Sequence, residues 1–111
     1  MKAEIAVERL AALAQESRLA IFRCLVQEGA EGLCAGDIAT RLGLAPATLS
    51  FHLKELSRAG LLKSRQEGRF IYYAPDFKAM NALLGYLTEN CCGGASCGVG
   101  CTPVSAEEAA R

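Results

Sequence analysis

The chain of 111 residues is long enough for one compact domain with a modest core. Its 12 lysines and arginines balance 12 aspartates and glutamates, and 51% of its residues are hydrophobic, which excludes a disordered or uniformly basic protein. No apolar run approaches the roughly 18 residues that a membrane span needs, and the first ten residues carry acids where a signal peptide would be apolar. We therefore expect a cytoplasmic protein that does not contact a membrane.

Two amphipathic helices are predicted in the first third of the chain. Residues 4–14 and 17–28 each repeat apolar side chains at helical spacing. The two apolar faces consist of Ala6, Leu10 and Leu13, and of Leu19, Phe22, Leu25 and Val26. Gly29 and Gly32 then provide the stop signals expected after a helix, and Cys24 is expected to be a small buried residue beside the second face.

A helix-turn-helix is predicted next. One short helix runs from Ala35 to Leu42 and is ended by Gly43, because glycine adopts positive φ at low cost. The following helix begins at Pro46, whose missing N–H has no partner in a first turn, and ends at Gly60. Its inner side is formed by Leu49, Leu53 and Leu56. Two short helices joined by a tight turn that contains glycine are typical of a helix-turn-helix.

A β-hairpin and a last helix complete the predicted domain. Strands over residues 61–65 and 70–74 flank a turn at Gln66, Glu67 and Gly68, so the fold class is a mainly α winged helix-turn-helix with a small β-hairpin. After Pro75, a helix capped by Asp76 has an apolar face of Phe77, Met80, Leu84 and Leu87. We expect residues 1–90 to form the DNA-binding and dimerisation domain, and residues 91–111 a Cys- and Gly-rich, irregular tail that senses a ligand.

Basic residues concentrate in the helix-turn-helix and the hairpin. From residue 41 to residue 69 there are six basic and two acidic residues, a net charge of +4, which suits a phosphate backbone. The outward face of the second helix of this motif carries small and polar groups that allow close approach to the major groove of double-stranded DNA. The predicted DNA contacts are Ala47, Thr48, Ser50, Phe51, Lys54 and Arg58 on this helix and Arg65 and Arg69 in the hairpin.

His52 is the only histidine, and it lies on the flank of the same helix. We expect it to pack or to form a local hydrogen bond, since no nucleophile and base pair can be assembled around it. No catalytic residue and no catalytic cofactor are predicted. The protein is therefore not expected to be an enzyme or to bind a small organic substrate.

The segments SRLAIFRCL, DIATRLGLAPATLSFHLKELSRAGLL and EGRFIYYAP resemble the ArsR/SmtB family of metal-responsive winged-helix repressors, and the resemblance covers nearly all of residues 5–90. It implies a homodimer packed through the first and last helices. It also implies that this dimer binds an imperfect palindrome in operator DNA, with half-sites about one helical turn apart.

Two metal sites of that family are not matched by this sequence. Many arsenic-responsive members begin the third helix with Leu-Cys-x-Cys-Asp-Leu, whereas Gly36 stands here in place of the second cysteine. Zinc-responsive members carry histidines and carboxylates along the last helix, and residues 77–89 contain no histidine. Cys34 is therefore expected to be a structural thiol.

Four cysteines follow the last predicted helix within eleven residues: Cys91, Cys92, Cys97 and Cys101. The first three resemble the C-terminal site of another branch of arsenite-responsive repressors. Adjacent side chains on a helix diverge by about 100°, so the first two can share an ion only if the helix ends before them. Asn90, Gly93 and Gly94 make such an ending plausible, and the missing secretion signal favours reduced thiols.

Three thiolates without an imidazole favour soft ions, and As(III) or Sb(III) is naturally three-coordinate. We therefore predict an arsenite-responsive repressor that leaves its operator when Cys91, Cys92 and Cys97 bind As(III). Cys101 is an alternative ligand, and a four-cysteine site for cadmium, lead or zinc remains open, as does oxidation of the same thiols. A different class also remains open, namely a metal-buffering or adaptor module whose winged helix contacts proteins.

Overall fold

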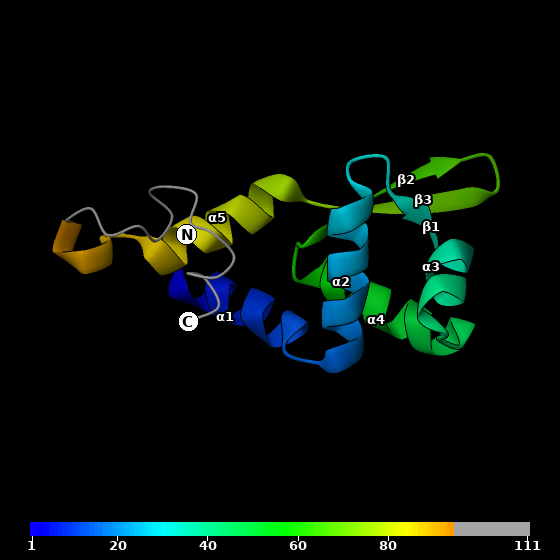
Figure 1. Ribbon diagram of the computed structural model, residues 1–111, viewed down its shortest axis with the longest axis horizontal. Coiled ribbons are helices and arrows are strands. Elements are labelled where there is room, and N and C mark those ends of the chain that lie inside the picture. Colours follow the sequence, from blue (N-terminus) through cyan, green and yellow to red (C-terminus); the bar gives the residue numbers. More distant parts are fainter. Residues whose placement is uncertain (95–111) are drawn as a thin grey trace, which may run out of the picture.

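The computed structural model describes residues 1–94, which form a mainly helical domain with a three-stranded sheet (Figure 1). The elements in chain order are α1 Ala3–Leu13, α2 Glu16–Glu28, β1 Leu33–Cys34, α3 Ala35–Leu42, α4 Pro46–Arg58, β2 Leu62–Glu67, β3 Phe70–Pro75, α5 Phe77–Thr88 and the 3-10 helix η1 Cys91–Gly94. This arrangement confirms the predicted winged helix-turn-helix. Within the described residues, no helix has the length and apolar character needed to cross a membrane.

The turn between α3 and α4 has the predicted geometry. Gly43 ends α3 in the left-handed conformation, with φ 65° and ψ 36°, and the N–H of Leu44 donates to the carbonyl of Ala39 over 3.1 Å. Pro46 occupies the first turn of α4, as expected. The two helices therefore pack against each other across a connection of only three residues.

The hairpin is longer than predicted. Strands β2 and β3 pair antiparallel from Leu62 opposite Pro75 to Glu67 opposite Phe70. The prediction that Gln66 and Glu67 belong to the turn was therefore wrong. Gly68 has a φ of +64°, which allows the chain to reverse over two residues and the pairing to continue to the last residue of β2.

Strand β1 was not predicted. It pairs antiparallel with β3 through Leu33 opposite Tyr73 and Cys34 opposite Tyr72, so the sheet has the order β1-β3-β2. Gly32 makes this pairing possible, because a Cβ at this position would lie 2.4 Å from the carbonyl oxygen of Tyr73. The glycine was interpreted only as a helix stop, but it also lets two backbones approach closely.

The core lies between α2, the helix-turn-helix and the base of the hairpin. Its buried residues are Ile21, Phe22, Leu25, Leu33, Ile38, Leu49, Leu53, Leu56, Leu61 and Leu62. The prediction for Leu19 was wrong, since this side chain is 45% exposed while Ile21 is fully buried. Helix α2 contacts α1, α3, α4 and β3, so its buried side is centred on Ile21 and Leu25 rather than on the predicted apolar face that included Leu19.

Helices α1 and α5 lie side by side at the end of the molecule away from the hairpin (Figure 1). Ala79 and Leu83 of α5 are buried, whereas Leu84 and Leu87 are 53% and 55% exposed. The predicted apolar face of this helix was therefore partly wrong. The helix is apolar around more of its circumference than α1 covers, so the uncovered leucines remain on the surface.

Candidate functional site

Helix α4 buries one face and presents the other to solvent. Leu49, Leu53 and Leu56 are buried in the core. All six residues predicted to contact DNA from this helix are exposed: Ala47, Thr48, Ser50, Phe51, Lys54 and Arg58. Phe51 is 56% exposed, which is unusual for a large aromatic side chain and suits contact with thymine methyl groups.

His52 faces the protein rather than solvent, as expected. It is only 7% exposed, and Nη1 of Arg18 lies 3.3 Å from its Nδ1. Arg18 also donates from Nε to the carbonyl of Ala12 over 2.7 Å. The histidine therefore fixes the middle of α4 to the junction between α1 and α2, and it is not a surface ligand.

Arg9 provides a second link to α4, and sequence analysis missed it. Its Nε donates to the carbonyl of Ala59 at the C-terminus of α4 over 3.2 Å, and its Nη1 donates to the carbonyl of Ala79 on α5 over 3.4 Å. The available sequence signal was the position of Arg9 three residues after the buried Ala6, on the same face of α1. One arginine thus joins α1, α4 and α5.

The basic side chains differ in how they are paired. Arg58 forms an ion pair with Glu55 on the same helix over 3.1 Å, whereas Lys54 and Arg69 make no ion pair within residues 1–94. Exposed ion pairs are weak, so the pairing of Arg58 does not prevent a phosphate contact. Lys54 and Arg69 can therefore contact a phosphate without breaking an ion pair.

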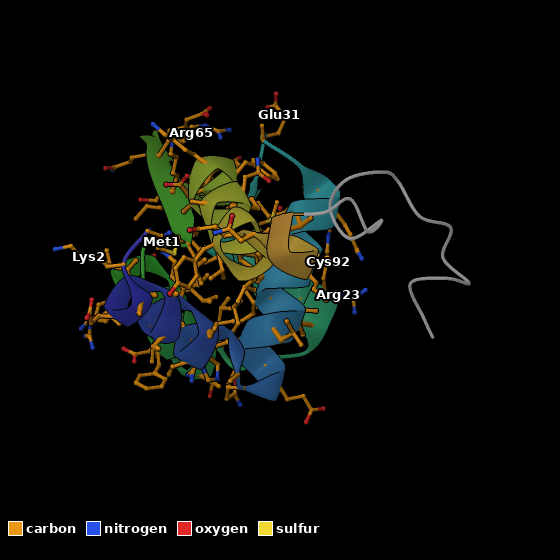
Figure 2. All side chains as sticks on the ribbon, turned by 90° about the vertical axis from the view of Figure 1, so that its left-hand side faces the viewer. Met1, Lys2, Arg23, Glu31, Arg65 and Cys92 are labelled. Atoms are coloured by element: carbon orange, nitrogen blue, oxygen red, sulfur yellow. The ribbon has the colours of Figure 1, made fainter. Side chains whose placement is uncertain are left out.

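Arg65 is held by the protein itself. It donates from Nη1 to the carbonyl of Glu31 over 2.7 Å, pairs with Glu67, and lies 4.9 Å from the centre of the Tyr72 ring. Figure 2 places Arg65 and Glu31 at the same edge of the molecule. The hydrogen bond to Glu67 raises the pKa of the Arg65 guanidinium, so the group stays charged. Arg65 therefore links the hairpin to the loop after α2, and it remains a predicted DNA contact.

The cysteine pair lies just beyond α5, at the far end of the molecule from the hairpin (Figure 1). The helix ends at Thr88, and Asn90 and Cys92 have φ values of 56° and 57°, in the left-handed region. The two side chains consequently do not diverge, and the sulfur atoms of Cys91 and Cys92 are 3.7 Å apart. The helix therefore ends before the pair, as a shared ion requires.

The other predicted ligands, Cys97 and Cys101, lie outside the described residues. Within residues 1–94, no three side chains of the His, Cys, Asp or Glu type lie close enough together to hold a metal ion. Cys24 and Cys34 are half-buried, and Cys34 precedes α3 without forming a side-chain cap. The part of the chain that the structure describes therefore brings together two of the predicted ligands.

In a helix-turn-helix, the second helix is called the recognition helix, and here it is α4. A winged helix whose recognition helix is exposed and carries basic side chains defines a class of DNA-binding transcriptional regulators. Residues 13–65 match the model of a helix-turn-helix domain family. Over 87 residues the chain is 36% identical to the nodulation protein NolR of Rhizobium meliloti, covering 78% of this chain and 69% of that protein. The chain belongs to the ArsR/SmtB type of winged-helix transcriptional regulators.

Two further relatives bear on assembly and ligand. The cadmium resistance regulatory protein CadC of Listeria innocua is 39% identical over 72 residues, which are 64% of this chain and 59% of that protein. The homodimeric winged helix-turn-helix domain of Mb0332 from Mycobacterium bovis matches with a TM-score of 0.64 and 27% identity, covering 85% of this chain and 87% of that one.

Proposed function

We propose that the protein is a homodimeric repressor that binds operator DNA and is released when As(III) or Sb(III) binds Cys91, Cys92 and Cys97. The observation that carries this proposal is the cysteine pair beyond α5, whose sulfur atoms are 3.7 Å apart. Two thiolates on one ion at about 2.3 Å would have sulfur atoms roughly 3.3–3.5 Å apart at the angles of a three-coordinate ion with a lone pair, and roughly 3.8 Å apart at a tetrahedral ion. The pair therefore needs little rearrangement to hold one soft ion.

The proposed dimer uses α1 and α5. Exposed apolar side chains gather on these two helices, which supports an interface that buries them in a second copy. The side chains concerned are Ile5, Val7 and Leu10 on α1 and Leu84 and Leu87 on α5. The homodimeric relative from Mycobacterium bovis supports the same assembly. In a symmetric dimer, two copies of α4 would contact two half-sites of a palindrome.

The proposed DNA contacts divide into two kinds. Lys54, Arg58 and Arg69 would contact phosphates, which fix the position of the protein but do not distinguish sequences. Ser50 and Phe51 lie on the exposed face of α4 and would contact base edges in the major groove. Arg65, already bonded to Glu31, would orient the wing against the backbone.

Arsenite binding would convert thiols to thiolate ligands. Arsenous acid gives up one hydroxide for each As–S bond, and this hydroxide leaves as water with the proton of the thiol. In the closed site, Cys97 would be held beside Cys91 and Cys92 at the end of α5. Because α5 contacts α1, and Arg9 joins both to the end of α4, a shift of α5 has a physical route to the recognition helix.

A second candidate ligand is a divalent soft ion, with Cys101 as a fourth ligand. The specific support is the similarity to CadC, a cadmium resistance regulator, although the chain spans only 59% of that protein. Cys₄ sites suit such ions, whereas three sulfur ligands suit As(III). The arsenite proposal is preferred because an adjacent pair with one further thiol completes a three-coordinate site.

Sulfur coordination tests the proposal directly. Reduced protein loaded with As(III) is expected to show three sulfur ligands by X-ray absorption at the arsenic edge, and serine at Cys91, Cys92 or Cys97 is expected to weaken As(III) binding. Cys24→Ser is the matched control and should bind As(III) like the unmodified chain. Retention of As(III) affinity in all three tail variants would refute the assigned site, and stronger retention of Cd(II) with four sulfur ligands would favour the second candidate.

A further inference from the structure

A groove at the base of the wing shares only Arg65 with the DNA contacts proposed above. Its volume is about 380 Å³, and it lies between the hairpin, the loop after α2 and the first turn of α5. Its lining includes three basic side chains, Lys63, Arg65 and Lys78, and three large apolar ones, Tyr72, Pro75 and Phe77. The groove is therefore cationic at its rim and apolar along its wall.

Backbone pairing places these groups on one face of the hairpin. Lys63 is opposite Ala74 and Arg65 is opposite Tyr72, so all four residues lie on the same face of the sheet. Lys78 comes from the first turn of α5, immediately after Phe77. Residues far apart in the sequence thus converge, and the site exists only in the folded chain.

The two lysine charges of the groove are available for a ligand. Lys63 and Lys78 are exposed and form no ion pair among residues 1–94. Of the residues that the structure describes, no aspartate or glutamate lines the groove. Arg65 is held by Glu31, Glu67 and Tyr72, so its guanidinium is fixed in place before any ligand arrives. An anion would therefore gain two free ammonium groups beside one preordered guanidinium.

The apolar wall selects the body of that anion. Pro75 is buried, and Tyr72, Ala74 and Phe77 are half-buried, so they form a firm surface with little entropy to lose on binding. An inorganic anion or a DNA phosphodiester would satisfy the lysines but would cover none of this surface. A molecule with a planar ring and a carboxylate would pair with the lysines and also cover the apolar wall.

We propose that this groove is a binding site for a small aromatic carboxylate. Such a ligand would contact the hairpin and the first turn of α5 at the same time. The cysteine pair follows the opposite end of this 12-residue helix, about 18 Å away along the helix axis at 1.5 Å per residue. The groove is therefore separate from the thiols, and a ligand bound there would contact the wing directly.

The test uses 2-naphthoate as the probe, followed by NMR of the backbone amides of the full chain. We expect saturable shifts confined to the groove residues. Two matched compounds serve as controls: 2-naphthamide lacks the charge, and inorganic phosphate lacks the ring. Each should bind about ten-fold more weakly than 2-naphthoate, because the first loses one or two partly exposed ion pairs and the second loses the apolar contact. Equal binding of phosphate and 2-naphthoate would overturn the proposal, as would the absence of saturable shifts.

Variants separate the groove from the DNA interface. Lys63→Gln and Lys78→Gln should each raise the Kd of 2-naphthoate about three-fold, while Lys54→Gln on α4 should leave it unchanged. Lys78→Gln should also leave the salt dependence of binding to a random DNA duplex unchanged. If the slope instead falls by about 0.9, the value for one lost phosphate contact, Lys78 belongs to the DNA interface and the carboxylate site is refuted.

Discussion

Arg18 on α2 and His52 on α4 are joined by a hydrogen bond of 3.3 Å between Nη1 and Nδ1. Because a guanidinium only donates, Nδ1 of His52 is the acceptor in this hydrogen bond. The same arginine donates to the carbonyl of Ala12 at the end of α1. One side chain therefore ties α4 to both α1 and α2.

Arg18→Met is expected to lower the free energy of unfolding by about 2 kcal/mol, because it leaves the buried Nδ1 of His52 and the carbonyl of Ala12 without this donor. Urea denaturation measures the change. Arg23→Met, at an exposed position on the same helix, is the matched control and should change stability by less than about 0.5 kcal/mol.

A double-mutant cycle isolates the pair. Arg18→Met combined with His52→Leu should cost less than the sum of the two single changes, because each single change already breaks the same hydrogen bond. Additive effects would show that Arg18 and His52 do not stabilise each other.

Two glycines on either side of β1 should respond oppositely to alanine. Gly32 has a φ of +76°, and a Cβ there would lie 2.4 Å from the carbonyl oxygen of Tyr73, so Gly32→Ala should cost at least about 2 kcal/mol. Gly36 lies in α3, and a Cβ added there would meet nothing within 4 Å beyond its own helix, so Gly36→Ala should gain about 0.5–1 kcal/mol.

Thermal unfolding followed by circular dichroism distinguishes the two glycine variants. At about 4–8 °C per kcal/mol for a domain of this size, Gly32→Ala should lower Tm by roughly 10 °C and Gly36→Ala should raise it by a few degrees. A Tm for Gly32→Ala equal to that of the unmodified chain would contradict the pairing of β1 with β3.

The exposed leucines of α5 should control assembly. Leu84→Glu combined with Leu87→Glu is expected to weaken the dimer at least about a hundred-fold, because an unpaired carboxylate in an apolar interface costs roughly 3 kcal/mol or more. Sedimentation equilibrium measures the dissociation constant. Ile71→Glu, at an exposed apolar position on β3, is the control and should remain as dimeric as the unmodified chain. Equal association of both proteins would place the interface elsewhere.

Two exposed residues of α4 should affect DNA binding differently. Lys54→Gln should weaken binding to all duplexes and lower the slope of log K against log salt by about 0.9, as expected for one phosphate contact. Phe51→Ala should instead weaken binding to an operator by about 1–3 kcal/mol more than binding to a scrambled duplex. Fluorescence anisotropy at several salt concentrations measures both. If the two variants behaved alike, α4 would not be the base-contacting element.

Local sequence signals predicted the helices well because each helix carries its own period and most are followed by a glycine that stops them. The α3–α4 turn follows from Gly43 and Pro46, whose backbone preferences are intrinsic. Strand β1 was missed because two residues have no measurable period, and its pairing depends on Tyr72 and Tyr73, nearly forty residues further along the chain. Leu19 and Leu84 were misplaced because the sequence does not specify how much of a helix its neighbours cover.

In the candidate site, as in the fold, the features that depend on local sequence were predictable and the long-range contacts were not. The exposed face of α4 follows from the positions of Leu49, Leu53 and Leu56, since the helical period fixes the opposite side. The contacts of Arg65 and Arg9 join residues 34 to 70 positions apart and cannot be derived from local patterns. The end of α5 before Cys91 was predictable from Asn90, Gly93 and Gly94, which favour the end of a helix.

Release from DNA is the most direct test of the central proposal. Reduced protein bound to a fluorescent operator, obtained by selection from a random duplex pool, is titrated with arsenite while anisotropy is followed. We predict a fall in operator affinity of about 5–150-fold, the usual range for coupled sites, with Cys91→Ser, Cys92→Ser and Cys97→Ser still bound to the operator at saturating arsenite. Unchanged operator affinity when the protein is saturated with As(III) would contradict the proposal.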